Sequence, residues 1–245
     1  MAVLLQWSLE DDFQPSTADA NIVGATVTNN LLTTLTRGPV SGYANDISSA
    51  GPASGATDVA TAISTGSYFY VSMTPTTGKT FSLTDMTFNM ARGGGATPRG
   101  YSVRSSVDDF ATALSQGDIA TQRPTFTPIT VDLSGASFQA VTGTITFNFY
   151  IYGPSTTTVM DWDALTINGS IGDTGTVNQE GFRWRADDGS QTTATWLAAQ
   201  DTSIIRPKQT NTRIRILLDS TLDRGATGYQ LEFREVGSDT WEVLE

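Results

Sequence analysis

Acidic residues near two predicted strands are the first candidates for chemistry in this sequence. Glu10, Asp11 and Asp12 follow the first strand-like run, and Asp161 and Asp163 belong to a later one. Glycoside hydrolysis requires two carboxyl groups at a defined separation in a cleft. Nothing in the sequence fixes such a separation, and no aromatic cleft pattern accompanies these acids. We therefore interpret them as noncatalytic turn acids, with cation binding as the alternative.

Two residue types that carry much of enzyme chemistry are missing. The chain of 245 residues contains no cysteine and no histidine. It can form no disulfide, no thiolate nucleophile and no serine–histidine triad, and it lacks the commonest metal ligand. Catalysis would have to rest on carboxylates, lysine, tyrosine or a bound hard cation. These absences favour a binding protein, and we expect no enzyme activity.

A glycine-rich stretch between arginines raises the alternative of a phosphate-binding loop. The stretch reads ARGGGATPRG over residues 91–100. A phosphate loop usually leads into a helix N-terminus, and the P-loop ends in Gly-Lys-Ser/Thr. Here the following residues alternate between apolar and polar at period two, which indicates a strand. We predict a β-hairpin with a long loop, formed by strands near residues 80–90 and 99–106.

Four arginines recur at period two near the C-terminus. Arg183 and Arg185 lie in the strand-like run GFRWRA, and Arg213 and Arg215 lie in TRIRILLD. Alternate residues of a strand share one face of the sheet, so this spacing predicts a face striped with arginine. One interpretation is a solvated surface. The other is docking on an acidic partner, which makes these four the candidate interface residues.

Aromatic residues gather in two strand-like runs, SYFYVSM at residues 67–73 and GTITFNFYIYG at residues 143–153. In an adjacent pair such as Phe149 and Tyr150, one ring must face the core and the other must face outward. Core packing accounts for most of these rings. An outward row along the second run would offer a platform for sugar rings.

Short strand-like runs bounded by Gly, Pro, Asn and Asp predict an all-β protein. After an N-terminal strand, we expect strands near residues 22–27, 31–36, 59–63, 67–73, 80–90, 99–106, 126–133, 144–152 and 159–167. One helical turn is expected within residues 106–117 and a polar loop over residues 41–58. The pattern lapses around residues 168–181, which predicts a linker between a domain at residues 1–172 and a domain at residues 173–245.

The charge balance limits the class of partner. A formal net charge of −11 and a pI near 4.3 argue against binding to nucleic acid or to an anionic membrane. No stretch is long enough to span a membrane, and the N-terminus lacks the basic and apolar regions of a signal peptide. We therefore expect synthesis in the cytoplasm without a secretion signal.

Two parts of the chain resemble known families. LLQWSLEDDFQPSTADANIVG, MDWDALTINGS and the middle stretch FSLTDMTFNMARGGGATPRGYSVRSSVDDF resemble strands of bacterial and viral lectin-like jelly rolls, a similarity over roughly residues 1–171. GYQLEFREVGSDTWEVL resembles the central hairpin of fibronectin type III and related immunoglobulin-like domains. The resemblance implies a jelly-roll β-sandwich followed by a smaller immunoglobulin-like β-sandwich. It also implies that Glu10 and Asp163 are the candidate ligands of a structural Ca²⁺, while no other cofactor is expected.

Domain pairs of this kind occur in phage particles as capsid decoration (cement) proteins, head fibres and tail-tip adhesins. From this resemblance we predict a structural protein on the capsid exterior of a virion. Its partner would be the major capsid protein or another virion protein, and it would form a homo-oligomer, with a trimer favoured. The alternative is a carbohydrate-binding adhesin that attaches to a host or surface glycan.

Overall fold

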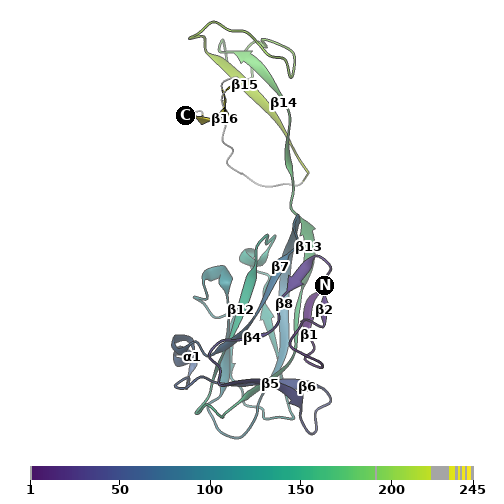
Figure 1. Ribbon diagram of the computed structural model, residues 1–245, viewed down its shortest axis with the longest axis vertical. Coiled ribbons are helices and arrows are strands. Elements are labelled where there is room, and N and C mark those ends of the chain that lie inside the picture. The colour runs from purple at the N-terminus through teal and green to yellow at the C-terminus, as the bar shows by residue number, and fades with distance from the viewer. Residues whose placement is uncertain are drawn as a thin grey trace. The chain divides into compact units, whose positions relative to one another are not determined.

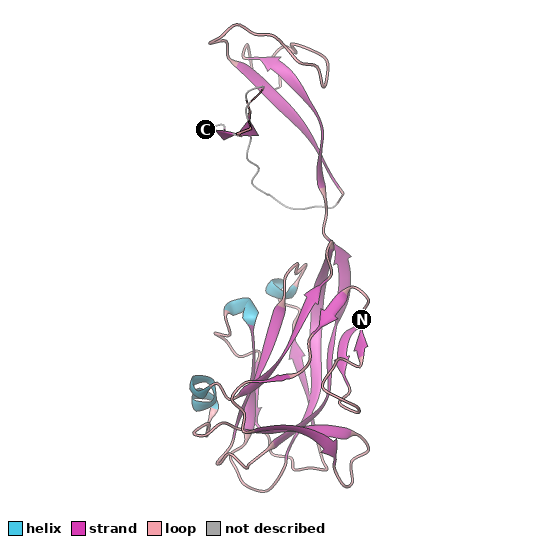
Figure 2. Cartoon of the chain, viewed as in Figure 1, coloured by secondary structure: helices cyan, strands magenta, loops and turns pink. Residues whose placement is uncertain are grey.

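The computed structural model describes residues 2–190, 192–221, 232–234, 237, 239–240 and 242–243. Strands dominate the described chain (Figure 2), which confirms the predicted all-β class. The chain divides into two compact units, Met1–Asp173 and Thr174–Glu245. We call them the first unit and the second unit.

The first unit is a sandwich of two antiparallel sheets (Figure 1), the architecture predicted for it. Sheet A has the order β11-β8-β13-β1-β2, with β6 paired to β13 and β5 paired to β6. Its strands are β1 (Ala2–Trp7), β2 (Thr17–Ala18), β5 (Thr34–Pro39), β6 (Asp46–Gly51), β8 (Lys79–Arg92), β11 (Thr127–Asp132) and β13 (Met160–Asp173). Sheet B has the order β10-β9-β12-β7-β3, with β4 paired to β7. Its strands are β3 (Ile22–Gly24), β4 (Thr28–Asn29), β7 (Tyr68–Pro75), β9 (Gly100–Ser105), β10 (Ser115–Asp118) and β12 (Ile145–Tyr152).

The core lies between the two sheets and follows from residue alternation. On β7 and β12, every second side chain is buried against sheet A. Phe69 stacks on Phe149 with ring centroids 4.7 Å apart, and on Trp162 of the opposite sheet at 4.4 Å. This aromatic stack joins the two layers and supplies a large apolar area, which is the dominant stabilising term for such a sandwich.

Two β-bulges let β8 and β13 keep their apolar residues on the core side. The register between these strands shifts between Asp163 and Thr166, where Ala164 has φ 54°. The extra residue places both Trp162 and Leu165 in the core, although their odd spacing would put them on opposite faces of a regular strand. A second shift, between Asn168 and Gly169, inserts one extra residue in β8. It lets Leu83 and Met86 both face the core, although their odd spacing would put them on opposite faces of a regular strand.

The predicted hairpin at the glycine-rich stretch is wrong. Strand β8 lies in sheet A and β9 lies in sheet B, so residues 93–99 cross from one sheet to the other. The strands themselves were expected close to where they lie. The pairing of these strands was predicted wrongly, because local alternation does not show whether consecutive strands are neighbours in one sheet or face each other across a core.

The run at residues 59–63 is a helix and not the expected strand. Helix α1 (Val59–Thr65) begins after Asp58, whose side chain accepts a hydrogen bond from Thr61 N at 2.8 Å, while Thr61 Oγ1 accepts from Asp58 N at 2.9 Å. This reciprocal capping box starts the helix, and Gly66 ends it at φ 69°. The turn expected in residues 106–117 is limited to the 3₁₀ helix η1 (Ser106–Asp108). A further 3₁₀ helix, η2, spans Ala136–Phe138.

The second unit contains a sheet of two long antiparallel strands, β14 (Val177–Ala186) and β15 (Thr212–Ser220). Short strands β16 (Glu232–Phe233) and β17 (Glu242–Val243) also pair with each other. Much of the predicted fibronectin-like hairpin at residues 228–244 lies outside the described residues. The linker expected at residues 168–181 is shorter than predicted, since β13 continues to Asp173 and β14 starts at Val177.

Candidate functional site

The four arginines that were predicted to form a stripe do share one face of the sheet in the second unit. In the register of β14 and β15, Arg183 is paired with Arg215 and Arg185 with Arg213. Residues that are directly opposite in an antiparallel pair lie on the same side of the sheet. We call this surface the arginine face. Like charges in such positions repel each other, so neighbouring groups must hold them in place.

Backbone carbonyl groups and one carboxylate supply part of this support. Arg183 Nε donates to Ala198 O at 2.9 Å, and Arg185 Nε donates to Ala194 O at 2.8 Å. Arg213 forms an ion pair with Asp187. Arg185 is almost fully buried, with 5% of its surface exposed, whereas Arg213 is more open to solvent. The arginine face is therefore a built arrangement and not a row of freely solvated side chains.

Trp196 supplies the rest of the support, and sequence analysis did not identify its role. The Cζ atoms of Arg183 and Arg185 lie 4.2 and 4.3 Å from the centre of the indole ring. Cation–π attraction at this distance offsets part of the repulsion between guanidinium groups. Because Trp196 belongs to a different segment from the two arginines of β14, its contact with them is visible only in the folded chain.

The segment that carries Trp196 runs antiparallel beside β14. Leu197 N donates to Trp184 O at 3.0 Å, and Asp201 N donates to Phe182 O at 2.8 Å. Asp188 Oδ1 accepts from Thr195 N at 2.9 Å, and hydrogen bonds from Thr195 lower the pKa of Asp188. These bonds fix the position of the indole ring relative to the arginines.

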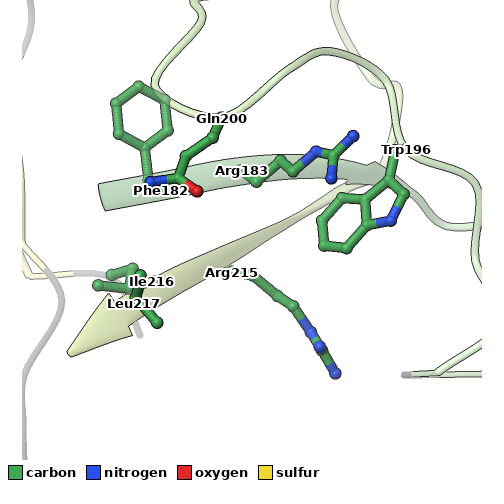
Figure 3. A pocket seen from close by; sticks show the side chains of 7 residues that line it. All are labelled: Phe182, Arg183, Trp196, Gln200, Arg215, Ile216 and Leu217. Atoms are coloured by element: carbon green, nitrogen blue, oxygen red, sulfur yellow. The ribbon is translucent and has the colours of Figure 1, made fainter. Parts of the chain in front are cut away.

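A cavity of about 290 Å³ opens beside the arginine face. We call it the Trp196 cavity; Figure 3 shows the side chains that line it, which are Phe182, Arg183, Trp196, Gln200, Arg215, Ile216 and Leu217. A side chain on Gly181 would place its Cβ 2.6 Å from Gln200 Nε2, so glycine at this position leaves room for that amide. These seven residues provide two guanidinium groups, an indole, a carboxamide and no carboxylate. This chemistry suits an anionic group carried on a partly apolar molecule.

The candidate calcium ligands lie on the outer side of sheet A. Asp163 is fully buried, and its Oδ2 accepts a hydrogen bond from Tyr43 Oη at 2.7 Å. Its Oδ1 is buried without a hydrogen-bond partner among the described residues. Burial raises the pKa of Asp163, and the negative charge of Glu10 adds to this. Glu10 is thus near enough to affect the titration of Asp163.

A positive side chain already contacts several oxygens beside Glu10. Arg37 Nη1 donates to Leu9 O at 3.3 Å and to Glu10 O at 2.6 Å, and it also pairs with the carboxylate of Asp46. Within the described residues, no group of three acidic side chains is placed to hold a metal. Ca²⁺ prefers six to eight oxygen ligands. The Asp163 carboxyl group also interacts with the Ala164 backbone and the Asn45 side chain, and the carbonyl oxygens of Leu9 and Glu10 are occupied by Arg37, so these surroundings fit a cation poorly.

The outward tyrosines expected as a sugar platform lie on β7 and β12. Phe69, Phe147 and Phe149 point into the core, so their strand neighbours face outward. Tyr150 and Tyr152 are packed beneath α1, with 6% and 5% of their surfaces exposed. Most of this row is therefore covered, and it offers less open surface than the Trp196 cavity.

Comparisons with known proteins find similarity at the level of structure. No protein-family model matches the sequence, and no curated protein matches it. The chain is similar to the K3 cleaved adhesin domain of Lys-gingipain from Porphyromonas gingivalis, with 18% identity, a TM-score of 0.40 and coverage of 68% of this chain and 99% of that one. It is also similar to the family 11 carbohydrate-binding module of Clostridium thermocellum in complex with a mixed-linked tetrasaccharide. There the identity is 12%, the TM-score 0.34 and the coverage 69% of this chain and 98% of that one.

These structures are domains of an adhesin and of a carbohydrate-binding protein, and neither similarity decides what this chain binds. The described part of the chain contains no helix long and apolar enough to cross a membrane.

Proposed function

We propose that this chain is a noncatalytic adhesive protein that binds acidic carbohydrate through the arginine face and the Trp196 cavity. The observation that carries the proposal is the direct pairing of Arg183 with Arg215 at the lining of a cavity where the seven described lining residues include no carboxylate. An anionic group in the cavity would lie within reach of both guanidinium groups, and charge-assisted hydrogen bonds from arginine to such a group are strong.

The chemistry of the side chains favours a carboxylate or sulfate on a sugar. The planar guanidinium group of arginine matches such groups with two parallel hydrogen bonds. Trp196 is 37% exposed, and Phe182 and Leu217 add apolar surface to the same cavity. Apolar faces of a sugar ring would pack against these side chains, while the Gln200 amide would bind a hydroxyl group.

Titration calorimetry with galacturonate oligosaccharides tests this function. We expect saturable binding that weakens as salt is added, because the attraction is partly electrostatic. The variant Arg183→Gln should bind roughly tenfold more weakly, since a charge-assisted hydrogen bond is lost. Lys208→Gln removes the same charge from an exposed position in the second unit and should leave the affinity unchanged. Equal binding by both variants, or preference for neutral oligosaccharides, would refute the proposal.

Decoration of a phage capsid remains a second candidate, predicted from resemblance. One observation favours a protein partner: Ile216 and Leu218, alternate residues on one face of β15, are 38% and 44% exposed. Adjacent apolar side chains on a surface are typical of contact sites. Co-sedimentation with purified phage shells tests this role, and analytical ultracentrifugation tests the expected trimer. If the chain stays in the supernatant at all salt concentrations, the decoration role is wrong.

A further inference from the structure

Three arginines converge at one end of the first unit. Arg92 ends β8, Arg99 precedes β9, and Arg123 lies in the connection between β10 and β11. Arg123 N donates to Arg92 O at 3.0 Å, which brings two of these segments together. Arg99 is 4% exposed, and its Nη1 donates to Val159 O at 2.7 Å. Burial lowers the pKa of Arg99, and the positive charge of Arg92 lowers it further.

One buried carboxylate faces this cluster. Asp161 has no exposed surface; its Oδ1 accepts from Ser49 Oγ at 2.6 Å, and its Oδ2 lies 3.3 Å from Arg123 Nη1. Burial raises the pKa of Asp161, although the charges of Arg123 and Arg99 oppose that shift. The cluster therefore has three positive groups against one carboxylate, within a chain of net charge −11.

Several polar atoms of the cluster lack a partner. Arg92 Nε, Arg99 Nε and Asp161 Oδ2 are buried, and none of them has a hydrogen-bond partner among the described residues, although Asp161 Oδ2 forms the ion pair with Arg123. Leaving a charged donor unsatisfied in the interior is costly, and such atoms often mark the place of a water or an ion. Two orphaned guanidinium donors indicate that the missing group is an acceptor.

The glycine-rich loop allows close approach to these donors. A Cβ on Gly94 would lie 3.3 Å from Arg99 Nη2, and a Cβ on Gly93 would lie 2.4 Å from Val159 Cγ2. Gly94 thus lets the backbone lie against Arg99 without a side chain in between, and Gly93 lets it lie against Val159. No helix follows this loop, so a phosphate-binding loop of the P-loop type is not expected here. Here the donors are arginine side chains and not a helix terminus.

One member of the cluster, Arg123, lines a second cavity. This cavity of about 410 Å³ is lined by Pro39, Val40, Ser41, Gln122 and Arg123. The side chain of Arg123 is 36% exposed, so it connects the cavity with the buried part of the cluster. An anion that enters here would meet Arg123 first.

We propose that Arg92, Arg99 and Arg123 form a binding site for one oxyanion, a carboxylate or a sulfate group. The site goes beyond the proposed function, because it belongs to the first unit and shares no residue with the arginine face. If no anion binds to this site, the proposed role of the Trp196 cavity is unaffected. If no sugar binds to the Trp196 cavity, the proposal for this site is likewise unaffected. The anion has two candidate sources, an inorganic ion and the acidic group of a sugar.

Nuclear magnetic resonance of the ¹⁵N-labelled full chain tests the site. Sodium sulfate and sodium galacturonate are titrated separately at ionic strength held constant with sodium chloride. We expect saturable shifts at the amides of Gly93, Gly94 and Gly95. Saturation by sulfate alone, by galacturonate alone or by both supports the site and identifies the source. Shifts that stay linear with both anions overturn it.

Variants separate this site from general salt effects. Arg123→Gln should weaken binding roughly tenfold, because one charge-assisted contact is lost. Lys79→Gln removes the same charge at the opposite end of β8 and should have no effect. Gly94→Asp places a carboxylate beside Arg99, so it should abolish the shifts caused by sulfate, whereas Gly94→Asn should weaken them less. Unchanged sulfate binding in both Arg123→Gln and Gly94→Asp would refute the proposal.

Discussion

Arg183 on β14 lies directly opposite Arg215 on β15, so two guanidinium side chains project from the same side of one sheet and line the same cavity. Cross-strand pairs of opposite charge stabilise a sheet, and pairs of like charge destabilise it. This arrangement is the reverse of what stability alone would favour. Trp196 and the carbonyl oxygen of Ala198 make it tolerable.

Replacing Arg183 should therefore cost the fold little. In Arg183→Gln, relief of repulsion opposes the loss of the cation–π contact, and each effect is worth roughly 0.5–1 kcal/mol. We expect the free energy of unfolding to change by less than about 1 kcal/mol, measured by chemical denaturation. A loss of several kcal/mol would mean that this arginine is mainly a structural residue.

The buried Asp163 should make the protein more stable in mild acid. Its pKa is raised in the folded state, whereas in the unfolded chain it titrates near the ordinary value of about 4. The folded state thus holds the proton to higher pH, and stability should fall as the pH rises from about 4 through the raised pKa. Asp161 acts in the same direction. We expect Asp163→Asn to raise Tm at pH 7 and to flatten this dependence.

A bound calcium ion would reverse the sign of that result. If Glu10 and Asp163 ligate Ca²⁺, Asp163→Asn should lower Tm in calcium-containing buffer, and a chelator should lower the Tm of the parent chain. Glu10→Gln should then reproduce the loss, whereas Asp11→Asn, at a neighbouring exposed acid, should not. A Tm that is identical in calcium and in chelator would end the calcium hypothesis.

Arg37 should be important for the conformation of the chain after β1. Its Nη1 binds Leu9 O, Glu10 O and the Asp46 carboxylate, and Leu9 is buried with φ 62°. A left-handed leucine is strained and depends on its surroundings. Arg37→Met should lower the free energy of unfolding by about 2 kcal/mol, because charge-assisted hydrogen bonds are lost. Thermal and urea unfolding measure this, and an unchanged midpoint would contradict it.

Glycine should be essential at residue 169, beside the second bulge. A Cβ there would lie 2.2 Å from Ser82 O and 3.1 Å from Leu83 Cα, and neither backbone atom can move independently. Gly169→Ala should therefore cost about 1–3 kcal/mol through overpacking. Gly143→Ala is the matched control, because nothing lies within 4 Å of its Cβ position. Equal midpoints for the two variants in urea would show that the strands adjust freely.

Period-two alternation was enough to predict the all-β class, most strands of the first unit and the shared face of the four arginines. It failed where pairing is decided by distant residues. The alternation of β8 and β9 is real, yet it could not show that they lie in different sheets. Helix α1 was missed because its seven residues carry little periodic signal, although the Asp58–Thr61 capping pattern was present.

In the candidate sites, too, features with a local cause were predicted and features that depend on distant residues were not. The spacing of Arg183 and Arg185 predicted the stripe, because the cause is local. The meeting of these residues with Trp196, and the convergence of Arg92, Arg99 and Arg123, depend on segments that only tertiary pairing joins. Bulges, likewise, leave no clear pattern in the sequence, since Trp162 and Leu165 look out of phase until the extra residue at Ala164 is known.

The position of β13 has a mechanical consequence. This strand ends at Asp173, where the first unit stops, and it is flanked by β1 and β8. Any tension transmitted along the chain from Thr174 enters the sandwich through this strand. To yield, β13 would have to break ladders on both sides and drag Trp162 out of the core. A tether anchored at the centre of a sheet resists pulling better than one anchored at its rim.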